Sequence, residues 1–272
     1  MMKFGYCTGF SLPEGKNEPQ RDTRGMWEYI HGLGYDHIEC SVASLLNIPN
    51  DKYDEHCALC HEIGLVVGSV NCFIPGNMRL CGPEKNSDAE ITAHVINVFD
   101  HMKKIGAHTI VFGSGPARAI PEGISREEGL EDIRHFLRMI APLAAEYGIT
   151  VAIEPLNRKD TNVLTSLSET YAMVRELDLP SIRMLADSYH MSVEGEEPEI
   201  PAEYVPYIKH VHIAESGTRH YPGSSGGEYV KRMLCSLRDN GYEDTVSVEC
   251  FAKDIHQDLK LVIEFLKEIG VK

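Results

Sequence analysis

Eight short apolar runs recur along the chain, and a longer stretch with helical periodicity follows each of them. The runs cover residues 4–8, 37–40, 66–72, 109–112, 150–153, 183–186, 210–214 and 245–250. They are rich in Val and Ile and too short for helices, which is typical of strands buried on both faces of a parallel sheet. The stretches between them carry helix start signals, because Ser87, Ser125 and Ser166 are each followed three residues later by Glu, as in a capping box.

This alternation of strand and helix signals predicts an α/β fold. Eight such units can close into a barrel or form a large doubly wound sheet. No G-x-G-x-x-G motif follows the first run, which disfavours a dinucleotide-binding sheet. We therefore predict a single (β/α)8 TIM barrel, formed as one domain by residues 1–272.

The charge of the chain limits its partners. Its 41 acidic and 26 basic residues give a formal net charge of -15, which opposes binding to nucleic acid and to anionic membranes. The first ten residues lack the features of a signal peptide, and no apolar run approaches the roughly 18 residues of a membrane span. The eight cysteines are scattered and are expected to be free thiols in a reducing compartment. We expect a cytoplasmic protein with a small-molecule substrate.

Four polar side chains stand at the ends of the last four apolar runs: Glu154, Asp187, His212 and Glu249. In a barrel these ends meet at the face where active sites lie. Three carboxylates brought together there would repel one another unless a cation compensates. The sequence therefore predicts a site for one divalent ion, for which oxygen ligands with one imidazole suit Mn, Co, Mg or Zn.

Two histidines in the seventh run compete for the role of ligand. His210 and His212 point to the same side of a strand, and His212 is favoured because it lies nearer the end of the run. His210 would then orient a neighbour or fill the barrel interior. Glu39, at the end of the second run, is a candidate to orient a ligand, with a role in a loop as the alternative.

The residues around these four positions resemble a known family. The segments are Glu154-Pro-Leu-Asn-Arg158, Asp187-Ser-Tyr-His-Met191, His210-Val-His212 with Glu215, and Val248-Glu249-Cys-Phe251. They look like the signatures of the xylose isomerase-like barrel superfamily. Within it they are most similar to the ketose 3-epimerases that act on D-tagatose and D-psicose.

The resemblance implies a function and a mechanism. Glu154, Asp187, His212 and Glu249 would bind the metal ion, with Mn favoured, and Glu154 and Glu249 would also act as the acid/base pair. The reaction would be C3 epimerisation of a ketose through a metal-stabilised cis-enediolate. Family members are commonly dimers or tetramers, so a homodimer or homotetramer is expected by analogy.

The family's substrate contacts map onto His190, Arg219 and Asp160. Phe251 matches an apolar wall position in the family, with core packing as the alternative. Glu215 would bind a terminal hydroxyl or orient His190. Asp160 stands where these epimerases carry Glu.

A second departure lies after the fourth run. The segment 112–118 has no Trp to stack on the sugar, and its glycine-rich turn with Arg118 could receive a phosphate or carboxylate. The alternative is a tight turn chosen for shape. Trp27, the only tryptophan, is expected to be packing. An acidic or phosphorylated sugar is therefore a second substrate class.

Four other functions share the expected fold. An aldose–ketose isomerase of the hydroxypyruvate isomerase type and an inosose dehydratase would both use a similar enolate. A barrel that binds metal or sugar without catalysis is disfavoured by the acids at 154 and 249. The abasic-site endonucleases of the superfamily are disfavoured by the net charge and by the shortage of strand-end histidines in the first half.

Overall fold

A computed structural model of the protein describes residues 1–10 and 23–272, and in these residues eight parallel strands close into a barrel. Neighbours in the barrel follow chain order, from β1 beside β2 to β8 beside β1. The strands are β1 Lys3–Cys7, β2 His37–Ser41, β3 Val66–Asn71, β4 Thr109–Phe112, β5 Thr150–Ile153, β6 Ile182–Asp187, β7 Ile208–Ile213 and β8 Thr245–Val248. The predicted (β/α)8 TIM barrel is confirmed.

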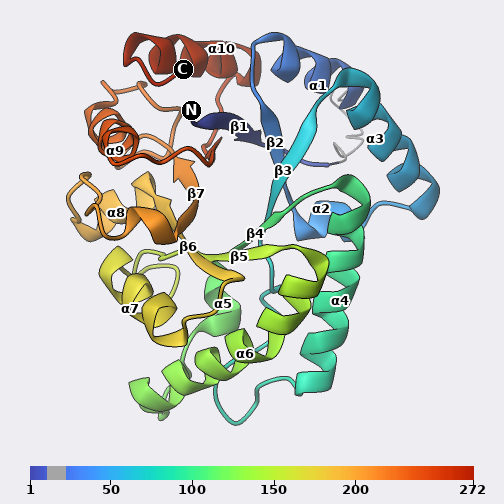
Figure 1. Ribbon diagram of the computed structural model, residues 1–272, viewed down its shortest axis with the longest axis vertical. Helices are drawn as coiled ribbons and strands as arrows, with labels where there is room; N and C mark the ends of the chain where they lie inside the picture. Colours follow the sequence, from blue (N-terminus) through green and yellow to red (C-terminus); the bar gives the residue numbers. More distant parts are fainter. Residues whose placement is uncertain (11–22) are drawn as a thin grey trace.

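Helices surround the strands, as Figure 1 shows. They are α1 Thr23–Gly32, α2 Val42–Leu46, α3 Asn50–Ile63, α4 Asp88–Ile105, α5 Gly115–Arg118, α6 Arg126–Tyr147, α7 Leu167–Leu177, α8 Ser188–Glu194, the 3-10 turn η1 Val205–Tyr207, α9 Glu228–Asp239 and α10 Ile255–Glu268. All eight predicted runs coincide with strands, with ends that differ by at most two residues. The run predicted to end at residue 250 ends at Val248, so Glu249 begins the loop after β8.

Two of the three predicted capping boxes are complete. Ser87 and Ser125 each accept a hydrogen bond from the backbone N–H three residues on, and Glu90 and Glu128 bond back. At the start of α7, Ser166 accepts from the N–H of Glu169, but the Glu169 carboxylate instead accepts from the N–H of Thr165. That box is therefore only half formed.

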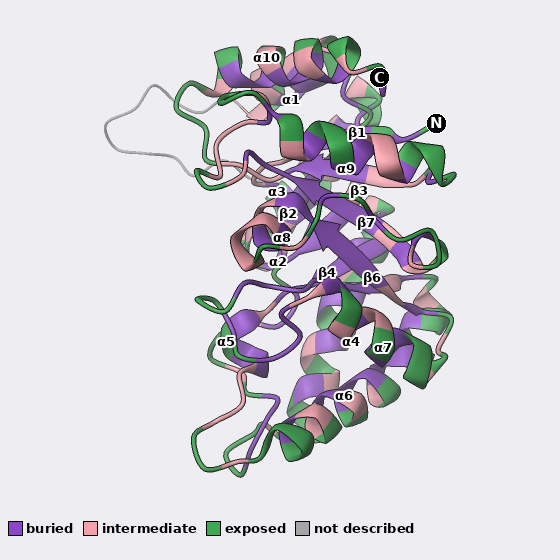
Figure 2. Ribbon diagram, turned by 90° about the vertical axis from the view of Figure 1, so that its left-hand side faces the viewer, coloured by how far each residue is buried: buried purple, intermediate pink, exposed green. Residues whose placement is uncertain are grey.

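Most strand residues are buried, except that Lys3 and Val66 are exposed at the starts of β1 and β3, and the helices alternate buried and exposed residues, as Figure 2 shows. Trp27 packs against Phe10 with no exposed surface, which confirms its expected packing role. Among residues 1–10 and 23–272, no helix combines the length and the apolar character needed to cross a bilayer.

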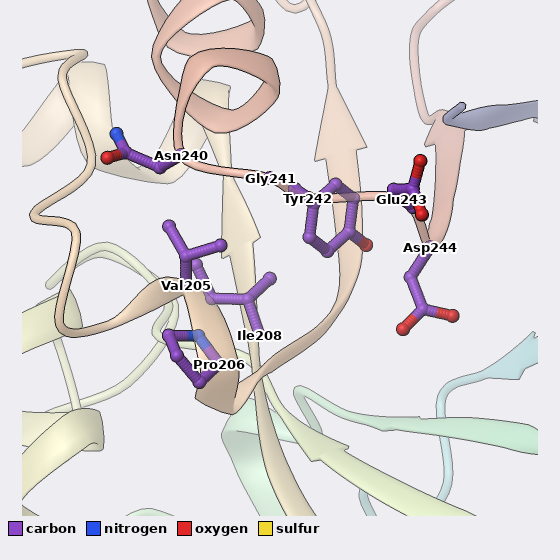
Figure 3. A pocket seen from close by; sticks show the side chains of 8 residues that line it. All are labelled: Val205, Pro206, Ile208, Asn240, Gly241, Tyr242, Glu243 and Asp244. Carbon is purple, nitrogen blue, oxygen red and sulfur yellow. The ribbon is translucent and has the colours of Figure 1, made fainter.

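A shallow pocket lies at the opposite end of the barrel from the carboxyl ends of the strands. Ile208 at the start of β7 and Asp244 just before β8 line it, together with Tyr242 (Figure 3). Residues at this face of a barrel serve stability, whereas catalytic groups occupy the other face.

The barrel interior holds a buried imidazole, that of His37 at the start of β2. His37 lies between Gly5 and Gly68, and its Nε2 is 3.2 Å from the hydroxyl of Ser247. Burial, together with the neighbouring His210, lowers the pKa of His37 to about 3, so its ring is neutral. A methyl group at residue 5 would lie 2.2 Å from Nε2 of His37, so the two glycines make room for the ring.

We expect Gly5→Ala to lower the free energy of unfolding by about 1–3 kcal/mol, because the buried ring has nowhere to move. Gly32→Ala is the matched control, because an added methyl there meets no atom within 4 Å. It should be neutral or stabilising by up to about 1 kcal/mol. Urea denaturation measures both, and equal stability of the two variants would contradict this account.

Candidate active site

The carboxyl ends of β5 to β8 bring four predicted side chains together. Glu154 directly follows β5, Asp187 ends β6, His212 is the second-last residue of β7, and Glu249 directly follows β8. Asp187 and His212 are register partners in adjacent strands, and the N–H of Glu249 donates to the carbonyl of Ile213. Ligand atoms of all four residues lie within 4.8 Å of one another.

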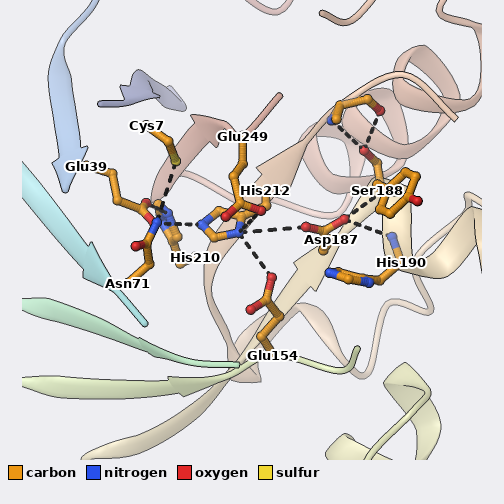
Figure 4. Close-up of polar contacts among 12 residues, drawn as sticks. Cys7, Glu39, Asn71, Glu154, Asp187, Ser188, His190, His210, His212 and Glu249 are labelled. Atoms are coloured by element: carbon orange, nitrogen blue, oxygen red, sulfur yellow. Dashed lines mark hydrogen bonds and ion pairs between the residues drawn. The ribbon is translucent and has the colours of Figure 1, made fainter. Parts of the chain in front are cut away.

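The carboxylates converge on Nδ1 of His212, as Figure 4 shows. This atom lies 3.2 Å from Glu154, 3.5 Å from Glu249 and 3.7 Å from Asp187. Burial alone would lower the pKa of His212, but Glu39 and Glu249 raise it well above its usual value. The cluster therefore already attracts positive charge.

Asp187 is oriented by a helix that begins beside it. One carboxylate oxygen accepts from the N–H groups of Tyr189 and His190 and so caps α8. The other oxygen is the one that lies toward His212. A single residue thus both starts a helix and contributes charge to the cluster.

Glu249 pairs with Arg219 at the rim of the barrel. The guanidinium of Arg219 lies over the rings of Tyr189 and Phe251, with centroids at 5.0 and 5.7 Å. Arg219 has a positive φ of 54°, and its carbonyl accepts from the N–H of Phe251. The predicted wall residue Phe251 is 64% exposed, so it lies on the rim and is not part of the core.

His190 is held by a residue that sequence reasoning missed. Its Nδ1 accepts from the backbone N–H of Asn157 at 3.1 Å and lies 2.8 Å from the amide Nδ2 of Asn157. That amide also donates to Asp160 at 2.8 Å, while Asp160 itself is 3.8 Å from His190. Asn157 therefore links the two predicted substrate contacts. Its place in the Glu154-Pro-Leu-Asn-Arg158 segment was the available signal.

Glu215 has a different contact from the two that were expected. It is buried, and its carboxylate accepts from the N–H of Gly223 at 2.8 Å. Its proposed role in orienting His190 is not found, because Asn157 holds that ring. Glu215 instead fixes the loop after β7.

The structure contradicts the prediction that Arg118 binds substrate. Arg118 has no exposed surface, and its guanidinium donates to the carbonyls of Phe112, Glu154 and Leu164. Burial lowers the pKa of Arg118 to about 10. The side chain therefore joins the ends of β4 and β5 and holds the main chain of Glu154, and the tight-turn alternative for residues 112–118 is the better description.

Gly113 leaves space for the carboxylate of Glu154. A Cβ atom at this position would lie 2.2 Å from Oε2 of Glu154. The segment after β4 thus has no room for a side chain toward the cluster at residue 113, which is consistent with the absence of an aromatic residue there.

The donor set fits a divalent cation. Three carboxylates and one imidazole nitrogen supply hard oxygen ligands and one borderline nitrogen ligand. The excess negative charge of the three carboxylates would favour a doubly charged ion. The structure thus defines a class of protein. It is a (β/α)8 barrel with an acidic site, suited to a divalent cation, at the ends of its last four strands.

The comparison with known families agrees with this class. Residues 27–269 match the family model described as xylose isomerase-like TIM barrel, so the chain belongs to that family.

Several characterised proteins are similar to the chain. The 3-dehydro-D-guloside 4-epimerase of Escherichia coli (strain K12) is 24% identical over 265 residues, which cover 91% of this chain and 92% of that protein. A ketose 3-epimerase of Arthrobacter globiformis is 30% identical over 128 residues, 47% of this chain and 44% of that protein. The chain also aligns with a crystal structure of D-psicose 3-epimerase in the presence of D-fructose. The alignment covers 100% of each chain, with a TM-score of 0.83 and 19% sequence identity.

We expect Arg118→Met to lower the free energy of unfolding by about 3 kcal/mol or more, since it leaves buried carbonyls without donors. Arg138→Met is the control, because Arg138 forms a surface ion pair with Glu131 and should contribute less than about 1 kcal/mol. Denaturant titration measures both. An unchanged stability, together with a weaker affinity for anionic sugars, would restore the predicted substrate role.

Proposed function

We propose that the protein is a divalent-metal-dependent isomerase that inverts the carbon next to the ketone of a keto sugar. The first candidate reaction is C3 epimerisation of a ketose. Isomerase activity is supported by the sugar epimerases to which the chain is similar in sequence and in structure. The metal ion and the mechanism are our inference from the site.

The observation that carries the proposal is the pair Glu154 and Glu249. They directly follow β5 and β8, and they approach Nδ1 of His212 from different sides at 3.2 and 3.5 Å (Figure 4). Inversion needs one group to remove a proton from one face of a carbon and another to supply a proton to the opposite face. Two carboxylates on different sides of one small cluster meet that need.

The steps follow from these two residues. One carboxylate takes the proton from the carbon beside the ketone. The electron pair of the broken C–H bond becomes the C=C bond of an enediolate, and the π pair of the ketone moves onto the ketone oxygen. The other residue, in its acid form, then donates a proton to the opposite face of the same carbon. Proton exchange with water restores the starting states. A divalent cation held by the four ligands would supply positive charge for the substrate oxygens.

Neighbouring residues would hold the sugar. Because Asn157 donates to Nδ1 of His190, a neutral His190 carries its proton on Nε2 and has a donor left for a hydroxyl. Arg219, held over Tyr189 and Phe251, presents a guanidinium at the rim. With Arg118 buried, the support for a phosphorylated or acidic sugar is removed, and a neutral keto sugar is favoured.

A second candidate is inversion at C4 of a 3-keto sugar. It is favoured by the similarity to 3-dehydro-D-guloside 4-epimerase, which covers 91% of this chain and 92% of that protein. The chemistry is the same, because C4 is then the carbon beside the ketone. Two other reactions would begin with the same proton removal. In hydroxypyruvate-type isomerisation the proton would return to a different carbon, and in dehydration of an inosose the intermediate would lose water.

We expect Glu154→Gln and Glu249→Gln each to lower the rate of epimerisation by at least about 100-fold, because each removes one proton-transfer group. The assay incubates Mn²⁺-loaded protein in D2O with ketoses, 3-keto sugars, inosose and hydroxypyruvate. NMR shows which carbon gains deuterium, and so separates the candidate reactions.

Glu196→Gln is the control, because that carboxylate accepts from the N–H of Leu167 at the start of α7 and has no part in the cluster. It should retain normal turnover. Full turnover by either cluster variant would rule out the two-carboxylate mechanism. Circular dichroism would verify that the variants are folded.

We also expect Gly113→Ala to lower kcat by about 10- to 100-fold, because the added methyl displaces the Glu154 carboxylate. The steady-state rate on the substrate identified above measures the effect, with Gly32→Ala as the control. Wild-type kcat in Gly113→Ala would show that the position of Glu154 is not critical.

A further inference from the structure

A buried carboxylate lies directly behind the cluster. Glu39, in β2, has no exposed surface. Its Oε1 accepts from Nε2 of His212 at 2.9 Å and from the amide of Asn71 at 2.9 Å. Its Oε2 accepts from Nε2 of His210 at 2.7 Å and from the hydroxyl of Ser69 at 2.6 Å.

These four bonds use the full accepting capacity of the carboxylate, which is about two hydrogen bonds for each oxygen. They come from β3 and β7, so Glu39 is held by two strands besides its own. His210 is itself held, because its Nδ1 lies 2.6 Å from the hydroxyl of Thr245. The carboxylate therefore has one position, set by the closed barrel.

That position determines which nitrogen of His212 faces the cluster. A carboxylate only accepts, so Nε2 of His212 must carry a proton toward Glu39. A bound cation would take the place of a proton on Nδ1, so the metal-bound ring would turn the lone pair of Nδ1 toward the ion, between Glu154, Glu249 and Asp187. The ring thus presents its basic nitrogen to the place where a cation would bind.

We infer that Glu39 is a positioning residue, which fixes the orientation and protonation of His212 so that Nδ1 is ready to bind a divalent cation. The inference rests on the proposed function, because it needs a metal ion at the cluster. His210, Ser69 and Asn71 support Glu39 and act on the metal site through it. Glu39 itself lies behind the ring and does not contact the substrate.

The alternative is that Glu39 only balances charge in the barrel interior. Glu39 has no exposed surface and bonds to the rings of two histidines, which is the arrangement that charge balance would need. A carboxylate that only balances charge would act equally well after a small displacement. One that orients His212 would not.

Substitutions at residue 39 separate these roles. Glu39→Gln keeps the shape and removes the charge, whereas Glu39→Asp keeps the charge but draws the carboxylate back by one methylene group. If Glu39 positions His212, both variants should bind Mn²⁺ about 10- to 100-fold more weakly than the wild type, measured by calorimetric titration. Glu196→Gln is the matched control and should bind Mn²⁺ with wild-type affinity.

A spectroscopic measurement tests the orientation of the ring directly. In zinc-loaded protein labelled with ¹⁵N, long-range ¹H–¹⁵N spectra should show a protonated Nε2 and a metal-bound Nδ1 for His212. Glu39→Gln should shift or remove the Nε2–H signal. Ser69→Ala, which removes a single bond to Glu39, keeps the test decisive if the residue 39 variants fail to fold. It should weaken Mn²⁺ binding severalfold.

The outcomes distinguish the two proposals. No binding of Mn²⁺ by the wild type would overturn the proposed function and this inference together. Tight binding by the wild type with equal affinity in Glu39→Gln, or in Ser69→Ala if that variant alone folds, would overturn the positioning role alone. Weak binding by Glu39→Gln with full affinity in Glu39→Asp would replace it with charge balance.

Discussion

The concentration of negative charge around Nδ1 of His212 is the constraint on which the rest of the site depends. Three carboxylates lie within 3.7 Å of that one atom, and mutual repulsion would separate them in a flexible chain. They stay together because each is attached to a strand end of a closed barrel or to the loop directly after one. The fold thus holds charges in an arrangement that a cation would stabilise.

Contacts with the backbone fix the positions of the carboxylates in the cluster. Asp187 is aimed by the two N–H groups that it caps, and the main chain of Glu154 is held by the buried guanidinium of Arg118. Gly113 leaves the space that the Glu154 carboxylate fills. None of these features is itself reactive. They restrict the carboxylates of Asp187 and Glu154 to one arrangement, and the proposed proton transfer would be sensitive to displacements of about 1 Å.

Polar groups continue from the site into the barrel interior. His212, Glu39, His210, Ser69 and Asn71 form a buried network in which every bond to the carboxylate comes from a strand. Such a network is stable only when its members are satisfied, which favours one arrangement of the rings. The proposed role of this network in orienting Nδ1 of His212 would explain why the barrel interior holds a buried carboxylate in place of apolar side chains.

The strands and helices, and the meeting of three acids and one histidine at strand ends, could be predicted from the sequence because they depend on local periodicity and on the order of elements in a barrel. The preference for His212 over His210 followed from its nearness to a strand end, and the structure brings His212 into the cluster.

The role of Arg118 could not be read in the same way. A glycine-rich turn with an arginine has the same sequence whether its guanidinium faces a ligand or three carbonyls, and burial alone decides between them. The contacts of Glu215 with Gly223, and of Asn157 with His190, likewise join residues whose distances depend on how loops pack. The sequence by itself determined which chemical groups stand at the strand ends. Only the tertiary structure decided which of them face one another, because side-chain direction and burial are set by neighbours distant in the chain.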